Sequence, residues 1–192
     1  PSSVMTGSYD MDLVILSVLI AIISSYAALG LAAHLSSRVS LNTTLWTTGC
    51  AVVMGGGIWS MHFIGMLAFS IPIPVQYNIY LTVYSLFVAI LVSGLALHFV
   101  ARTRQIKSSA FIISGLLMGI GIASMHYIGM EAMDMSAEIY YDFWIFSASI
   151  VIAIIASTTA LYIAFQLRES KPGARLWLKL GASIVMGLAI AG

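Results

Sequence analysis

The chain has 192 residues, of which 60% are hydrophobic and only 8% are charged, and its formal net charge is +1. Soluble domains carry about 25% charged residues, so this composition excludes an ordinary soluble protein. The small net charge gives no reason to expect a nucleic-acid partner. The single cysteine, Cys50, excludes an intramolecular disulfide framework.

Six hydrophobic segments follow one another along the chain, separated by short polar connections. A helix needs about 20 mostly apolar residues to cross the hydrocarbon, and the first five segments reach that length. Only helices and closed barrels satisfy their backbone in lipid, and these segments are too long and continuous for barrel strands. We therefore predict an all-α membrane protein. The predicted transmembrane helices cover residues 11–35, 45–70, 79–101, 109–130, 143–167 and 176–192.

The two ends of the chain need separate interpretation. Residues 1–10 are predicted to be an N-terminal segment outside the membrane, and residues 11–192 the membrane domain. Residues 1–4 precede a methionine and are interpreted as a cloning remnant, and the first hydrophobic run is too long for a cleavable signal peptide. The last segment has only 17 residues from Leu176 to Gly192, so we expect it to be an incompletely represented helix.

Charge fixes the expected orientation. All Lys and Arg residues follow the first, third and fifth segments, with Lys179 just inside the predicted sixth, whereas the opposite ends are acidic or neutral. By the positive-inside rule, the basic connections are cytoplasmic and the N-terminus lies outside. The basic residues are Arg38, Arg102, Arg104, Lys107, Arg168, Lys171, Arg175 and Lys179.

An internal repeat runs through the chain. Residues 54–66 (MGGGIWSMHFIGM) recur 64 residues later as 118–130 (MGIGIASMHYIGM), and a third copy, 186–192, ends one residue before its Met-His pair would begin. The preceding helices also match, 30–34 (GLAAH) with 94–98 (GLALH) at an offset of 64. Because two crossings return the chain to its starting side, the repeats are parallel. We expect three helix pairs around a pseudo-threefold axis normal to the membrane.

The repeated motif combines an imidazole with thioethers. His62 and His126 lie at the same depth, late in helices that run outward, and Met66 and Met130 follow them on nearly the same helix face. Imidazole suits copper, zinc and iron, whereas thioether favours Cu(I), so copper is the metal we favour. Haem held between the two histidines is the nearest alternative. The predicted ligands are His62, His126, Met61, Met66, Met125 and Met130.

Packing alone is the alternative explanation for some of these residues. Single methionines in an apolar helix usually serve packing, which we expect for Met54, Met118 and Met186. His34 and His98 lie close to the basic connections, where they can reach the interface. An ionisable group deep inside a span is costly and functional by default, which favours ligation by the two motif histidines.

Residues 61–66 (MHFIGM) and 125–130 (MHYIGM) resemble the motif of the MHYT family of bacterial membrane sensor domains, and 7–10 (GSYD) is similar to that family as well. The resemblance covers essentially the whole chain. It implies a multi-pass sensory input domain in the bacterial inner membrane, with no catalytic residues of its own. It also implies that the motif Met and His bind copper and that the domain senses O2, CO or NO.

In many members of that family the domain is followed by cytoplasmic GGDEF and EAL domains, which make and break cyclic di-GMP. Neither sequence occurs in this chain, so we expect them as output domains of a longer parent protein, and we leave homodimerisation open. Ile64 and Ile128 stand where the family motif has Thr, and the third motif is missing. A metal site that requires three motifs would be incomplete in this chain.

Three classes of function are compatible with these features. A sensor needs a few fixed ligands, a copper transport or homeostasis protein needs polar groups along the whole membrane depth, and a structural module needs no histidines. Apart from Asp12 at the start of the first span, the predicted spans contain no Asp or Glu, and their imidazoles cluster at two depths. We therefore rank a sensor first, a transporter second and a structural module third.

The predicted topology can be tested by cysteine labelling. Cysteines introduced at Gln76 and Ser136 should react with an impermeant thiol reagent added to the periplasmic side, because both lie in connections without basic residues. Protection of both positions in intact cells would contradict the orientation.

Overall fold

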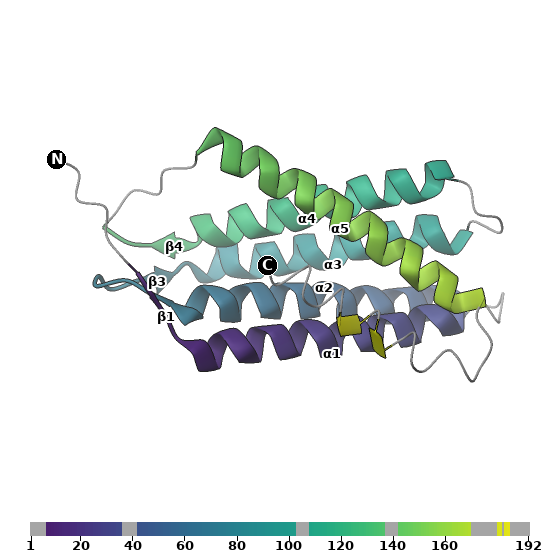
Figure 1. The fold of residues 1–192 in the computed structure, drawn as a ribbon, viewed down its shortest axis with the longest axis horizontal. Helices are drawn as coiled ribbons and strands as arrows, with labels where there is room; N and C mark the ends of the chain where they lie inside the picture. The colour runs from purple at the N-terminus through teal and green to yellow at the C-terminus, as the bar shows by residue number, and fades with distance from the viewer. Residues whose placement is uncertain are drawn as a thin grey trace.

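The structure is a computed structural model that describes residues 7–35, 42–102, 108–136, 142–169, 180–181 and 183–184. Five long helices run alternately up and down one axis (Figure 1). The all-α prediction is confirmed, and the predicted bounds of these five helices are within three residues of those observed. The predicted sixth helix, 176–192, lies outside the described residues except for 180–181 and 183–184, which are helical. The helices are α1 (Met11–Leu35), α2 (Asn42–Ala68), α3 (Ile79–Arg102), α4 (Ser108–Glu131) and α5 (Phe143–Glu169).

The chain is a multi-pass membrane protein. Among the residues whose side chains the structure describes, four helices contain a stretch that is long and apolar enough to cross a bilayer, and α1 contributes the apolar stretch Met11–Ala27. Large apolar side chains cover the outside of the bundle, as lipid contact requires. The four crossing stretches are Thr44–Ala68, Ile79–Phe99, Ile112–Glu131 and Phe143–Ile163.

Each helix packs along its neighbour in sequence. Contacts are extensive between α1 and α2, α2 and α3, α3 and α4, and α4 and α5. By contrast, α2 and α4 meet over a short stretch, and α1 and α5 are only loosely packed together. The buried core between the helices is formed by Cys50, Met54, Ile58, Ala89, Ala96, Leu97, Met118, Met125 and Leu161.

Three helices begin with the same cap. The side-chain oxygen of Asp10, Asn78 or Asp142 accepts a hydrogen bond from the backbone N–H two residues later, at 3.0, 3.0 and 2.8 Å respectively. Such caps satisfy N–H groups that have no partner within the helix. The caps therefore fix where α1, α3 and α5 start.

Two short ribbons tie the end of each repeat to its beginning. Strand β1 (Ser8–Tyr9) pairs antiparallel with β2 (Phe69–Ser70), and β3 (Gln76–Tyr77) pairs with β4 (Met133–Asp134). All of them lie at the end of the bundle where the Met-His motifs lie (Figure 1). Each ribbon thus joins the start of an odd-numbered helix to the end of the even-numbered helix that follows it.

The helix caps and the strand ribbons define which residues occupy equivalent positions in successive repeats. The caps are 68 residues apart between α1 and α3, at Asp10 and Asn78, and 64 apart between α3 and α5, at Asn78 and Asp142. The predicted match of 30–34 with 94–98 at an offset of 64 is therefore wrong by four residues, about one helical turn. Short runs of Gly, Ala and Leu recur easily in apolar helices, whereas the caps and strand pairs fix the true register.

Glycines on the even helices allow close approach to the next odd helix. A Cβ added at Gly55 would lie 2.6 Å from the Cα of Ile90, and one added at Gly119 would lie 2.5 Å from the Cα of Ile154. Counted from the caps, Ile90 and Ile154 are equivalent, so the α2–α3 and α4–α5 contacts are two copies of one interface. Small residues commonly permit such backbone contact between membrane helices.

Alanine substitution should separate this contact from ordinary helix effects. Gly55→Ala should destabilise the protein by about 1–3 kcal/mol, because the new methyl group meets backbone that cannot move aside. Gly56→Ala is the matched control, since a Cβ there meets nothing within 4 Å and both substitutions gain the same helix propensity. Unfolding measured in detergent should rank Gly55→Ala well below Gly56→Ala, and equal stabilities would contradict the proposed packing.

Candidate functional site

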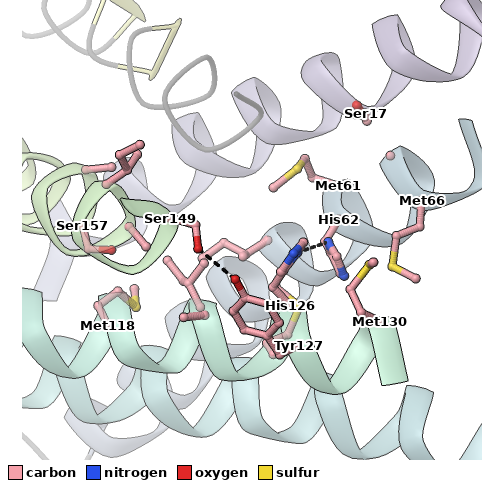
Figure 2. Close-up of a pocket in the computed structure, with 18 of the residues that line it drawn as sticks. Ser17, Met61, His62, Met66, Met118, His126, Tyr127, Met130, Ser149 and Ser157 are labelled. Atoms are coloured by element: carbon pink, nitrogen blue, oxygen red, sulfur yellow. Dashed lines mark hydrogen bonds between the residues drawn. The ribbon is translucent and has the colours of Figure 1, made fainter. Parts of the chain in front are cut away.

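Two histidines face each other where α2 and α4 meet. The Nδ1 atoms of His62 and His126 are 3.2 Å apart, and the ring centroids are 4.7 Å apart with 61° between the planes (Figure 2). A neutral imidazole has one donor and one acceptor nitrogen, so a direct hydrogen bond requires one Nδ1–H and one bare Nδ1. The same two nitrogens could instead bind one cation with both lone pairs.

Repeat geometry brings the histidines together. They are 64 residues apart, in equivalent turns of α2 and α4, and they project toward each other from the two helices. Gly129 leaves room for the pair, since a Cβ there would lie 2.7 Å from Nε2 of His62. A Cβ added at its counterpart, Gly65, would meet no atom within 4 Å, so the two histidines are not in identical environments. His62 is buried against the α4 backbone, whereas His126 is only partly buried.

The second nitrogen of His62 has no partner. Its Nε2 is buried and makes no hydrogen bond within the part of the chain that the structure describes. Leaving a buried polar atom unsatisfied costs about 1–3 kcal/mol. The pair is therefore costly as a packing feature alone, which favours a functional role for it.

All six predicted ligand residues line one cavity of about 700 Å³. The walls come from α1, α2, α4 and α5, and Figure 2 shows Met61, Met66 and Met130 around the two imidazoles. Met125 also belongs to the buried core, as do Met54 and Met118, which line the cavity as well. The expected packing role of Met54 and Met118 is therefore confirmed, although both also face the cavity.

These donors fit a soft metal ion. Metal–nitrogen bonds of about 2.0–2.1 Å at a tetrahedral angle place two imidazole nitrogens about 3.3 Å apart, close to the observed 3.2 Å. Among the described residues there is no group of three or more His, Cys, Asp or Glu that could hold a metal. The softest donors beside the histidines are the thioethers of the cavity, and thioether ligands favour Cu(I) over zinc or hard cations.

The same geometry disfavours haem between the histidines. Axial nitrogens bind iron from opposite faces and are about 4 Å apart, given bonds of about 2 Å. The Nδ1 atoms of His62 and His126 are in direct contact at 3.2 Å with the rings packed edge to face, and this arrangement leaves no space for a macrocycle between the two rings.

Sequence reasoning missed the serine hydroxyls of the cavity. The hydroxyl of Tyr127 lies 2.9 Å from Oγ of Ser149, and the buried Oγ of Ser157 has no hydrogen-bond partner among the described residues (Figure 2). Ser17 completes the set on α1. The signal was present, because counting from the caps gives equivalent serines at 17, 85 and 149 and again at 25, 93 and 157.

Aromatic side chains cover the end of the site that lies nearest the strand ribbons. Phe63 packs against Tyr77 of β3 with ring centroids 6.2 Å apart, and burial raises the pKa of the Tyr77 phenol above its usual value. Tyr77 therefore stays neutral and adds no charge near the motif. His98, in contrast, is exposed on α3, and the side chain of His34 lies outside the described residues.

Comparison with known proteins gives one family and several relatives. The chain matches the family described as MHYT, bacterial signalling protein N terminal repeat, at residues 2–47, 55–112 and 119–176. It is 45% identical to the bifunctional diguanylate cyclase/cyclic di-GMP phosphodiesterase MucR of Pseudomonas aeruginosa, over 97% of this chain and 27% of that protein. It is 37% identical to signaling protein YkoW of Bacillus subtilis (96% and 23%) and 36% identical to cyclic di-GMP phosphodiesterase NbdA of Pseudomonas aeruginosa (96% and 23%). The chain thus spans about a quarter of the length of these curated relatives. No solved structure matches it significantly.

The asymmetry of the two glycines provides a test of the histidine pair. Gly129→Ala should push the His62 ring away and break the contact between the two Nδ1 atoms, because the new methyl group would occupy the space beside Nε2. Nitrogen-15 NMR of protein labelled at histidine should show a changed His62 signal. Gly65→Ala is the matched control and should leave both signals unchanged; identical spectra for the two variants would contradict this geometry.

Proposed function

The chain belongs to the MHYT family of bacterial signalling proteins, and we propose that it is the copper-binding sensory input domain of a longer protein. The observation that carries this proposal is the direct contact between His62 and His126 beside a methionine-lined cavity. Neither imidazole has an acidic partner within the described residues of the spans, so a cation is the simplest ligand that would satisfy both.

In this proposal, His62 and His126 hold the ion through their imidazole nitrogens, and methionine sulfurs provide or frame the softer contacts. Copper bound in this way would supply a soft centre that takes a diatomic gas, O2, CO or NO, or that changes oxidation state. The chain contributes the rest of the site: it excludes water with Met61, Met66, Met125 and Met130 and holds the histidines in contact. The ribbon and aromatic side chains over the motif limit access from the outer end.

A signal from this site has a physical route to the other membrane face. The site joins α2, α4 and α5, through the histidine pair and the Tyr127–Ser149 hydrogen bond. Each of these helices continues to the opposite end of the bundle. A ligand that binds one arrangement of the helices more tightly than another shifts the population toward that arrangement. The helices would therefore transmit the change to the cytoplasmic end.

The output would lie in the remaining part of the parent protein. The names of two relatives specify diguanylate cyclase or cyclic di-GMP phosphodiesterase activity, and this chain covers only about a quarter of each of those proteins. We infer that this domain controls cyclic di-GMP turnover by such domains in the bacterial inner membrane and performs no catalysis itself.

A copper transporter is the second candidate. A transporter and a sensor would both use the six motif His and Met residues. Only a transporter also needs metal-binding groups along the whole depth of the membrane, so that feature separates the two functions. The described polar residues away from the histidines are mainly serine and threonine hydroxyls, several of which are bonded to their own helix. The two described imidazoles of the cavity lie at one depth, in direct contact, rather than in a series across the bilayer, which favours the sensor.

Metal analysis tests the copper site. Wild-type protein should bind copper, and the double variant His62→Ala, His126→Ala should lose at least about 10–100-fold in affinity, the range seen when even supporting groups of a metal site are removed. Copper stoichiometry should be measured by mass spectrometry on purified protein, with an optical spectrum to detect haem.

His98→Ala is the control for that experiment, because His98 is exposed on α3 and does not line the cavity. It should bind as much copper as the wild type. If the double variant and the wild type retain equal copper, the ion is bound elsewhere and the histidine pair is structural.

A further inference from the structure

The two even-numbered helices, α2 and α4, use their glycines differently. Every glycine of α4 is needed for close packing, since an added Cβ would lie closer than 3.0 Å to an atom of a neighbouring helix. On α2, three of the glycines have no such role, because an added Cβ would meet no atom of the described residues within 4 Å. The packed glycines of α4 are Gly115, Gly119, Gly121 and Gly129, and the unpacked ones of α2 are Gly49, Gly56 and Gly65.

Gly56 is not required by the fold of the repeat. Its counterpart in α4, 64 residues later, is Ile120, whose side chain is 53% exposed on the outside of the bundle. Gly49 likewise corresponds to Ile113, which is 49% exposed. A large side chain is therefore accommodated at both positions of the second repeat. Glycine in a helix interior is also less stable than alanine. Neither packing nor helix stability explains why α2 has a glycine at position 56.

Gly56 lies between two glycines that are held by neighbouring helices. A Cβ at Gly55 would lie 2.6 Å from the Cα of Ile90 on α3, and one at Gly57 would overlap the side chain of Ser24 on α1. These contacts hold α2 from two sides at one level. A bend of the helix between them would leave both contacts close to the axis of rotation, where atoms move least.

The part of α2 beyond these glycines carries the first Met-His motif. Just after them, the indole N–H of Trp59 donates to Oγ of Ser85 on α3 at 3.0 Å, which holds the helix close to the bend. Further out, α2 and α4 meet over only a short stretch, where the Nδ1 atoms of His62 and His126 are 3.2 Å apart. A small bend near Gly56 would therefore change the distance between the two imidazoles while most other contacts of α2 stay in place.

We propose that α2 has a hinge at residues 55–57 and that α4 is the fixed helix against which its outer part moves. The movement opens and closes the contact between His62 and His126. A hinge needs only a few residues that absorb a change in φ and ψ, and glycine does so with least steric hindrance. The use of this movement in signalling rests on the proposed sensor function. The hinge itself rests on packing alone and operates in protein without copper.

Amide hydrogen exchange tests the hinge in metal-free protein in lipid nanodiscs. Residues 54–60 of α2 should exchange faster than the equivalent residues 118–124 of α4. Gly56→Ala should slow exchange in 54–60 by about 2–5-fold, the ratio that corresponds to the difference in helix stability between glycine and alanine. The new methyl group meets no described atom, so packing adds nothing to this effect.

Two matched variants locate the effect. Ile120→Gly recreates in α4 the three consecutive glycines of α2 and should speed exchange in 118–124 by a similar factor. Gly49→Ala removes another unpacked glycine, two helical turns from the hinge, and should leave exchange in 54–60 unchanged. Equal exchange of the two segments in the wild type, no response to Ile120→Gly, or the same effect of Gly49→Ala and Gly56→Ala on 54–60 would each overturn the proposal.

Spin labels show whether the hinge moves the motif. In a Cys50→Ala background, labels at Leu67 of α2 and Glu131 of α4, both exposed, report on the ends of the two helices. Without copper, their distance distribution should be broader with Gly56 than in the Gly56→Ala variant, and equal widths would contradict the hinge. Copper should narrow the distribution of the protein with Gly56. A broad distribution that Gly56→Ala narrows and copper leaves unchanged would support the hinge and contradict the copper site.

Discussion

Hydrocarbon offers no water to polar groups, and most features of this protein follow from that constraint. The first N–H groups of α1, α3 and α5 are bound by side-chain caps, and the ends of the repeats are closed by paired strands. Ser17, Ser85 and Ser149 donate to carbonyl groups of their own helices. Among the described residues, three buried polar atoms lack a hydrogen-bond partner, namely Nε2 of His62, Oγ of Ser114 and Oγ of Ser157. Two of these residues, His62 and Ser157, line the cavity that the motif residues share.

The repeats share a backbone arrangement but differ in the side chains placed on it. Both even helices use a glycine to reach the backbone of the next odd helix, at Gly55 and Gly119. Near the end that carries the ribbons they diverge: Trp59 donates to Ser85 in the first repeat, whereas Tyr127 bonds Ser149 in the second. The contact of Gly129 with His62 has no counterpart at Gly65. Repetition therefore sets the depth of the two histidines, and the differences between repeats make one of them buried and the other partly accessible.

Such a site suits detection better than transport. Two imidazoles in contact, with thioethers around them, form a single compact set of donors near one end of the bundle, and the cavity is otherwise mainly apolar. A site of this kind can respond to a ligand by a small change in the distance between α2 and α4, which touch over only a short stretch. Because α5 is joined to this point through Ser149, the proposed sensor would carry a change there along a helix to the opposite membrane face.

The sequence alone determined the membrane class, the positions of five helices and the family, because hydrophobic length and a repeated motif are local properties. It also predicted both histidines as a pair, since equal depth in parallel repeats follows from spacing. It did not predict the register of α1 against α3, because GLAAH and GLALH match as short strings while the caps at Asp10 and Asn78 set a different alignment. Nor did it predict the serines of the cavity, the unpaired nitrogen of His62 or the different surroundings of Gly65 and Gly129. Those depend on which side chains meet across helices, and only the tertiary packing decides that.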